Sequence, residues 1–120
     1  MGKLINLSNH PSAFWSEEQK QTCTTLGDIV DMNFPNVDPA WDENDIAQVA
    51  DEICSRITQL KDVVAVHVAG EHTLTFAIVV RLLRAGYRCL TSTTERNSVN
   101  LPDGRIVKTF SFVRLRDYRL

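Results

Sequence analysis

The sequence predicts an α/β domain with a Rossmann-like, flavodoxin-like three-layer fold, in which a mainly parallel sheet ends in an antiparallel hairpin. Residues 63–69 are a short, β-branched, apolar run, which is typical of a strand covered on both faces. Residues 74–83 are apolar almost all round, which indicates a largely buried helix. Strand-like and helix-like segments alternate in this way along the chain, so we expect a single domain over residues 1–120.

The first strand is expected at residues 3–7, where an apolar run leads toward Pro11. Proline favours an extended backbone in the residue before it, so His10 is expected to be held at the carboxyl end of this strand. A second strand is expected at residues 28–35, because its apolar side chains suit a strand and Pro35 ends the run.

Two further helices precede and follow the second strand. Ser16 and Gln19 match a capping box, in which each side chain bonds the other residue's backbone N–H, and they predict a helix over residues 17–26. Residues 46–60 carry apolar side chains at spacings of three and four, with charged residues between them. This pattern predicts a crossover helix packed on the sheet.

The C-terminal part of the chain reads as one more strand followed by a hairpin. The turn residues Pro102, Asp103 and Gly104 lie between two strand-like arms. The expected segments are a strand at 87–91, a loop at 92–96, and hairpin arms at 97–101 and 105–115.

Right-handed crossovers favour the strand order 2-1-3-4 with an added antiparallel strand. In that order the carboxyl ends of the first and third strands are neighbours, at the edge where ligands bind in open α/β sheets. We expect the site to contain Ser8, Asn9, His10, Gly70, Glu71, His72, Thr73, Ser92, Thr93, Thr94, Glu95 and Arg96.

These residue types suit an anionic ligand. Hydroxyl groups, the N–H groups at a helix start and the Arg96 guanidinium can bind a phosphate, and His10, His72 and Glu71 are candidate general acids or bases. Several of the predicted site residues have a structural alternative. Gly70 could only make the turn, residues 9–11 could only form a turn, Thr73 could only cap the helix, and Glu71 could only complement the helix dipole. His67, inside a buried strand, reads as a core histidine.

Composition excludes several classes of protein. Thirteen Lys and Arg against fifteen Asp and Glu give a net charge of -2, which argues against coating long nucleic acid. No apolar run approaches the ~20 residues of a membrane helix, so we expect a cytoplasmic protein. No metal-ligand spacing occurs, and the three cysteines read as reduced packing residues. Dinucleotide, P-loop and GxSxG motifs are absent.

The run Leu7-Ser8-Asn9-His10-Pro11, the length of the α/β body and the run Ser92-Thr93-Thr94-Glu95-Arg96 together resemble the small CRISPR-associated proteins related to the CARF domain, including ring nucleases. This resemblance implies a homodimer that binds a cyclic oligoadenylate, such as the tetra- or hexa-adenylate. It also implies cleavage of the ring without metal or cofactor, which would damp a type III CRISPR response. Only Ser8 and His10 carry over from the strand-Ser-x-His-Pro junction, as the catalytic residues.

Three other functions stay open at this point. The chain could bind the cyclic nucleotide as a sensor or sequestering module without cleaving it. It could process nucleosides or nucleotides, as a glycosidase or deoxyribosyltransferase does, with Glu71 or Glu95 as nucleophile. A protein-interaction subunit without a small ligand is the fourth reading, because fold alone does not determine function.

Overall fold

The computed structural model describes residues 2–120 and has the α/β architecture that the sequence predicts. Within these residues one five-stranded sheet has the order β2-β1-β3-β4-β5, which agrees with the predicted order. Strands β1 to β4 pair in parallel, and β4 and β5 pair antiparallel. The elements are β1 (Lys3–Ser8), η1 (Ser12–Phe14), α1 (Glu17–Thr24), β2 (Asp28–Asn33), α2 (Glu43–Thr58), β3 (Val63–Ala69), α3 (His72–Arg84), β4 (Cys89–Asn100) and β5 (Ile106–Asp117).

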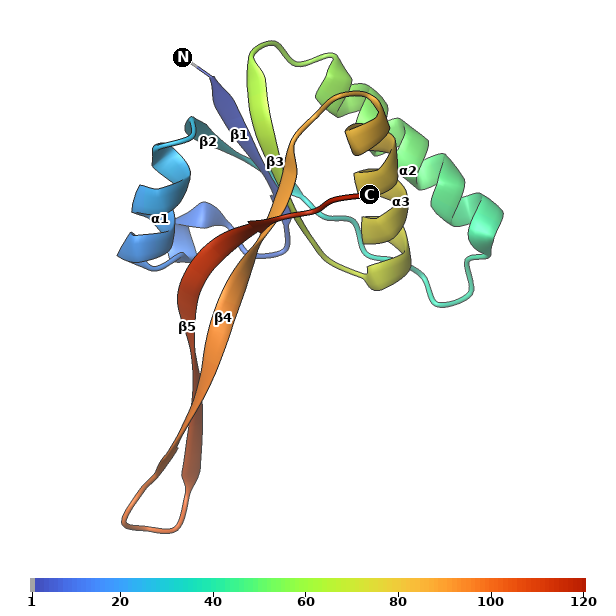
Figure 1. The fold of residues 1–120 in the computed structure, drawn as a ribbon. Helices are drawn as coiled ribbons and strands as arrows, with labels where there is room; N and C mark the ends of the chain where they lie inside the picture. Colours follow the sequence, from blue (N-terminus) through green and yellow to red (C-terminus); the bar gives the residue numbers. More distant parts are fainter. Residues whose placement is uncertain (1) are drawn as a thin grey trace.

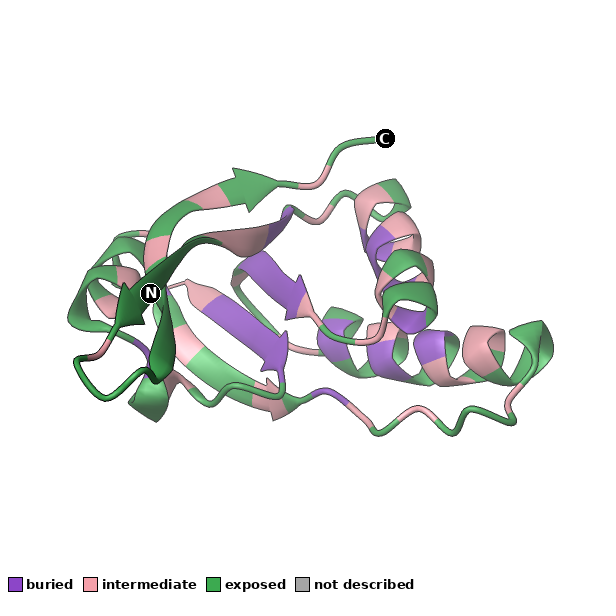
Figure 2. Ribbon diagram, turned by 90° about the horizontal axis from the view of Figure 1, so that it is seen from below, coloured by how far each residue is buried: buried purple, intermediate pink, exposed green. Residues whose placement is uncertain are grey.

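Helices cover both faces of the sheet, with α1 on one side and α2 and α3 together on the other (Figure 1). The alternation of side chains along a strand explains this arrangement. In β1, Ile5 packs in the core beneath α2 and α3, whereas its neighbour Leu4 packs on the other side with Trp15 and Cys23. The central strands and the facing sides of α2 and α3 hold most of the buried residues (Figure 2).

The α2 helix begins with a complete capping box. The Asp42 side chain accepts a hydrogen bond from the Asp45 backbone N–H, and the Asp45 side chain accepts one from the Asp42 N–H. At α1 the expected box is only half formed: Ser16 accepts from the Gln19 backbone, but the Gln19 amide does not reach back. It donates instead to the partly buried hydroxyl of Ser92, which β4 presents toward α1.

The expected loop at residues 92–96 is wrong. These residues belong to β4, which continues without interruption from Cys89 to Asn100. Each of them pairs across to β5, with a register shift between Thr93 and Thr94. Serine and threonine occur in turns, but a run of them suits a strand equally well when a partner strand lies opposite. The fourth strand and the hairpin are therefore one long ribbon.

The outer part of this ribbon, which we call the arm (residues 94–113), projects away from the body (Figure 1). Most of its side chains are exposed on both faces. The radius of gyration is 16.1 Å, against about 14 Å for a compact domain of this length. The arm thus places Thr94 and the residues opposite it outside the hydrophobic core.

The part of the chain that the structure describes contains no helix long and apolar enough to span a membrane. Cys23, Cys54 and Cys89 are all free thiols, and Cys23 and Cys89 are fully buried. Their position among core residues confirms the prediction that they are packing residues.

Candidate functional site

One face of the sheet changes from apolar to polar as its strands approach their carboxyl ends. On the side of α1, Leu4, Ala65 and Leu90 pack in the core. Two residues further along β1 and β3, the same face presents Asn6 and His67, which are register partners in neighbouring strands. The next positions on this face are Ser8, Ala69, Ser92 and Thr94. The polar residues therefore gather at the edge where ligands bind in open α/β sheets.

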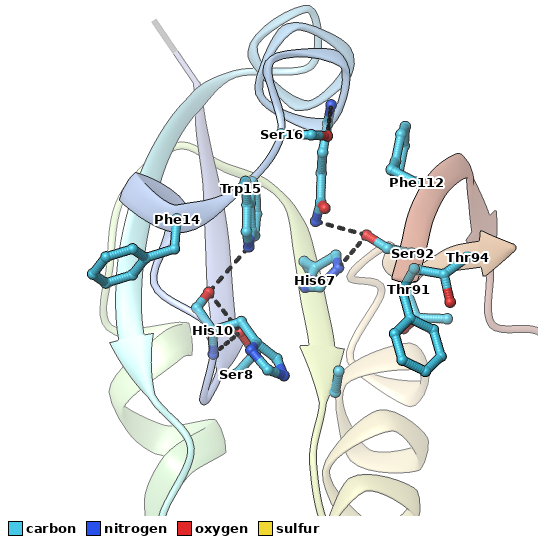
Figure 3. A pocket seen from close by; sticks show the side chains of 13 residues that line it. Ser8, His10, Phe14, Trp15, Ser16, His67, Thr91, Ser92, Thr94 and Phe112 are labelled. Carbon is cyan, nitrogen blue, oxygen red and sulfur yellow. Dashed lines mark hydrogen bonds between the residues drawn. The ribbon is translucent and has the colours of Figure 1, made fainter. Parts of the chain in front are cut away.

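Asn6 organises the loop that follows β1. It is 1% exposed, and its amide nitrogen donates to the His10 carbonyl at 3.0 Å and to Asp31 Oδ1 at 2.9 Å. Its amide oxygen accepts from the Ser8 hydroxyl at 2.8 Å. The indole N–H of Trp15 also donates to the His10 carbonyl, at 3.0 Å. These bonds fix the backbone that carries the His10 imidazole, and the bond from Trp15 is drawn in Figure 3.

Asp31 supports the same loop from the neighbouring strand β2. One oxygen accepts from the Asn6 amide and the Ser12 backbone N–H, and the other accepts from the Ser12 hydroxyl. Partial burial alone would raise the pKa of Asp31, but the hydrogen bonds from Asn6 and Ser12 outweigh it and lower the pKa. Asp31 is therefore a charged anchor for the loop.

A cavity of about 540 Å³ lies between this loop, α1 and the base of the arm. Figure 3 shows Phe14 and Trp15 on one side of it and Phe112, Ser92 and Thr94 on the other. It is lined by Ser8, His10, Phe14, Trp15, Ser16, Gln19, His67, Ala69, Thr91, Ser92, Thr94, Phe110 and Phe112. The size is typical of small-molecule sites.

His67 forms part of the wall of this cavity and is only 4% exposed. Its Nε2 atom and the Ser92 hydroxyl oxygen are 2.8 Å apart and share a hydrogen bond, and Gln19 donates to the same hydroxyl at 2.9 Å. The Trp15 ring packs against the imidazole, with ring centres 5.4 Å apart. Within residues 2–120, His67 Nδ1 is buried without a hydrogen-bond partner.

Burial, with a smaller contribution from the nearby His10, lowers the pKa of His67 to about 4. The imidazole is therefore neutral at physiological pH. His67 is buried, as expected of a core histidine, but within residues 2–120 only its Nε2 atom has a hydrogen-bond partner. His67 belongs to the cavity wall as well as to the core.

Four residues of the predicted site line the cavity: Ser8, His10, Ser92 and Thr94. The Ser8 hydroxyl is bonded to Asn6 and to the loop backbone, and the residue is 4% exposed. His10 is exposed. Its imidazole is therefore the ionisable group of the cavity lining that is accessible to a ligand.

The residues of the α3 junction lie beside the cavity lining rather than in it. Glu71 is the N-cap of α3, and its carboxylate accepts hydrogen bonds from the backbone N–H groups of Thr73 and Leu74. Hydrogen bonds from Thr73 lower the pKa of Glu71. The helix N–H groups that were expected to hold a phosphate are thus bonded to Glu71, and His72 is exposed at the helix start.

Packing explains why residue 70, which precedes the Glu71 cap, is a glycine. Its φ is not positive, unlike that of Gly86 and Gly104. A Cβ atom at position 70 would overlap the ring of Phe34, which is 3% exposed. Glycine at this position allows the chain to pass close to a buried aromatic ring.

The other predicted residues divide between the two faces of the ribbon. Arg96 is the register partner of Phe110, so it shares a face with the aromatic residue that lines the cavity. Thr93 and Glu95 point to the opposite face by strand alternation. In the described part of the chain Arg96 has no carboxylate within ion-pair distance, which leaves its guanidinium available. Asn9 is exposed in the loop after β1 and does not line the cavity.

Sequence reasoning missed several residues of the site. Asn6 could have been found, because it stands two positions before Ser8 and must share its face. No local signal marks the aromatic residues, which come from η1 and β5 and meet only in the folded chain. The residues missed are Asn6, Phe14, Trp15, Gln19, Asp31, His67, Thr91, Phe110 and Phe112.

Among residues 2–120 there is no group of three or more His, Cys, Asp or Glu side chains that could hold a metal ion.

A comparison with curated proteins found no significant match. Residues 2–116, nearly the whole chain, match the family described as the uncharacterized protein MJ1673 family. The match extends from β1 through the cavity lining to the end of the arm. The chain therefore belongs to the MJ1673 family.

Proposed function

We propose that this protein binds a cyclic oligoadenylate and cleaves it without a metal ion, as a cytoplasmic ring nuclease with a Rossmann-like fold that damps a type III CRISPR response. The observation that carries the proposal is the cavity at the carboxyl ends of β1 and β3 and beside the first half of β4, which combines an exposed histidine with hydroxyl groups and aromatic rings. The Ser-x-His-Pro run at the end of β1 supports it, because His10 lies in that cavity.

The reaction needs little from the protein beyond positioning and proton transfer. The ribose 2′-oxygen forms a bond to the adjacent phosphorus, and the bond from phosphorus to the 5′-oxygen breaks. The products are a 2′,3′-cyclic phosphate and a 5′-hydroxyl group. His10 takes the proton of the 2′-hydroxyl group while solvent protonates the leaving 5′-oxygen, or His10 protonates that oxygen while solvent takes the 2′ proton.

Developing negative charge on the phosphate requires a cation or hydrogen-bond donors. Because Glu71 occupies N–H groups at the start of α3, we assign this role to Arg96 and the Thr94 hydroxyl. Arg96 shares the cavity-facing side of the ribbon with Phe110. Ser8 contributes indirectly, because its hydroxyl holds the loop that carries His10.

The test is the loss of labelled cyclic tetra- or hexa-adenylate in the presence of EDTA. We expect cleavage by the unaltered protein, and a loss of at least about 100-fold in His10→Ala, as for a general acid or base. His72→Ala is the matched control, because His72 is an exposed histidine that does not line the cavity. Intact ligand after long incubation with excess protein would remove the catalytic proposal.

A non-catalytic sensor or sequestering module is the second candidate. It is favoured by the shortage of acid–base groups, because no carboxylate lines the cavity and His67 is buried and neutral. Calorimetry that shows tight binding while the ligand stays intact would establish this function. A nucleoside hydrolase or transferase is not supported by the geometry, because neither Glu71 nor Glu95 lines the cavity.

We also propose that two copies of the chain associate through the arm. An isolated two-stranded ribbon is marginally stable in water, yet the arm exposes apolar side chains on the face away from the cavity. Val99 and Val107 are register partners there, 52% and 41% exposed. Sedimentation should show that the parent protein is a dimer. The double variant Val99→Ser, Val107→Ser should be a monomer. Val64→Ser, at a 44% exposed position in β3, should leave the dimer intact; a monomeric parent protein would contradict the proposal.

A further inference from the structure

The charges of the chain are distributed unevenly between the body and the C-terminal ribbon. Residues 1–93 contain seven Lys and Arg against twelve Asp and Glu, whereas residues 94–120 contain six against three. The net charge of -2 therefore combines an acidic body with a basic ribbon. Because the arm projects from the body (Figure 1), its positive charge lies away from most of the carboxylates, where it can attract an anionic partner.

The paired strands of the arm separate their side chains by type. We call the even-numbered residues of 94–100 and 106–112 the cavity-side face, because they lie on the same side of the ribbon as Phe110 and Phe112, which line the cavity. This face holds every cation and every aromatic ring of the two segments: Arg96, Lys108, Phe110 and Phe112. Glu95, the one carboxylate of these segments, belongs to the odd-numbered face.

The groups of the cavity-side face are open to a ligand. Phe110 is 67% exposed, although burial of apolar surface is worth about 25 cal/mol per Å². Arg96 lies opposite Phe110 across the ribbon, and Lys108 precedes it by two residues on the same strand, about 7 Å away. In the part of the chain that the structure describes, neither cation has a carboxylate within ion-pair distance. An exposed ring beside two free cations suits a partner that is both flat and anionic.

We propose that the cavity-side face binds a short stretch of single-stranded nucleic acid, RNA or DNA. Bases stack on Phe110 and Phe112, and the cations Arg96 and Lys108 contact the phosphates between them. An acidic peptide would use the cations but would leave the rings exposed, so the combination favours a nucleic acid strand.

The dimensions of the face limit the length of the bound strand. The paired segments span about 20 Å, which is room for a few nucleotides. This agrees with a net charge of -2, which argues against coating long nucleic acid. The inference goes beyond the proposed function, because the bound strand is linear and follows the arm away from the cavity. The odd-numbered face stays available for the association of two copies.

Stacking and phosphate contacts have separate signatures. Loss of one stacking ring weakens binding about 5- to 150-fold, because stacking of a base on an aromatic side chain contributes about 1–3 kcal/mol. Loss of one phosphate contact makes the logarithm of the association constant fall less steeply with the logarithm of the salt concentration, by about 0.7 in slope. A site for acidic peptides would show a salt dependence without the loss on removal of a ring.

Fluorescence anisotropy measures both signatures with labelled oligouridylate and oligothymidylate of about 12 nucleotides, within the range of single-strand sites. The variants are Phe110→Leu, Phe110→Tyr and Lys108→Gln. Their matched controls are Phe76→Leu, at a 71% exposed position of α3, and Lys61→Gln, at an exposed position before β3. We expect Phe110→Leu to weaken binding at least about 5-fold and Lys108→Gln to reduce the salt slope. Phe110→Tyr, which keeps a stacking ring, and both controls should bind as the parent protein does.

The outcomes separate this inference from the proposed function. Equal affinity of Phe110→Leu and the parent protein would overturn the inference. Oligoglutamate or inorganic polyphosphate that binds as tightly as the strands would identify a site for any polyanion, and would overturn it too. Cleavage of the cyclic adenylate without binding of either strand would overturn the inference and leave the proposed function intact. Binding of a strand that Phe110→Leu weakens, without binding of the cyclic adenylate, would support the inference and remove the proposed function.

Discussion

The Nε2 atom of His67 lies 2.8 Å from the hydroxyl oxygen of Ser92, although 25 positions separate the two residues. This hydrogen bond joins β3 to β4 at the point where β4 leaves the body and becomes the arm. It also fixes a buried imidazole in the wall of the cavity. The burial of His67 makes the stability of the protein depend on pH.

Replacing His67 by Gln should reduce the loss of stability in acid. The unfolded chain takes up a proton at His67 near pH 6.5, whereas burial lowers the pKa in the folded protein to about 4. The unfolded state therefore binds more protons between these values, and the free energy of unfolding falls as the pH drops through this window.

Urea unfolding at about pH 7.5 and about pH 4.5 measures this effect. The parent protein should lose about 2–3 kcal/mol more than His67→Gln between the two pH values. His72→Gln, at an exposed position, should behave like the parent protein. Equal pH dependence in the parent protein and His67→Gln would show that His67 is not the source.

Replacing Asn6 by Ala should destabilise the protein by about 2–3 kcal/mol, because it leaves buried polar partners without their hydrogen bonds. The amide of Asn6 connects Ser8, Asp31 and the His10 carbonyl. Chemical unfolding gives the free energy. Asn44→Ala, at an exposed position near the start of α2, is the control and should change stability by less than about 0.5 kcal/mol. A similar small change in Asn6→Ala would contradict this account of the loop.

Replacing Gly70 by Ala should cost about 1–3 kcal/mol, the usual effect of overpacking. The added methyl group would overlap the Phe34 ring. A double-mutant cycle with Phe34→Leu identifies the cause, since the smaller side chain makes room for the methyl group. The double variant should be more stable than the sum of the two single changes predicts, and strict additivity would rule out the steric explanation.

Replacing Asp117 by Asn should lower stability by at most about 1 kcal/mol, because the ion pair that it breaks is partly exposed. Arg88 binds both oxygens of Asp117, at 2.7 and 3.2 Å, and these bonds lower the pKa of the carboxyl. The effect should shrink as salt rises from about 0.05 M to about 1 M. Asp103→Asn is the control, because the ion pair between Asp103 and Arg105 lies within the tip of the arm. A loss that salt does not change would argue against an electrostatic contribution.

The order of the strands, and the edge of the sheet at which the candidate site lies, were predictable from local patterns. The apolar runs of β1 and β3 and the stripe of α2 specify what each segment must bury. Right-handed crossovers then leave few topologies. His10 and Ser8 follow from the same argument, because the carboxyl end of a central strand is where such sheets bind ligands.

The tertiary structure alone decided three other features. Residues 92–96 form a strand because β5 supplies partners across from them, and no local propensity encodes that pairing. The Glu71 carboxylate caps its own helix. The sequence alone does not distinguish such a cap from a carboxylate that faces a ligand. The cavity lining brings together Phe14 and Phe110, which lie almost a hundred residues apart in the sequence. The sequence thus determined which groups reach the edge of the sheet by its local periodicity, and long-range packing decided which of them share a cavity.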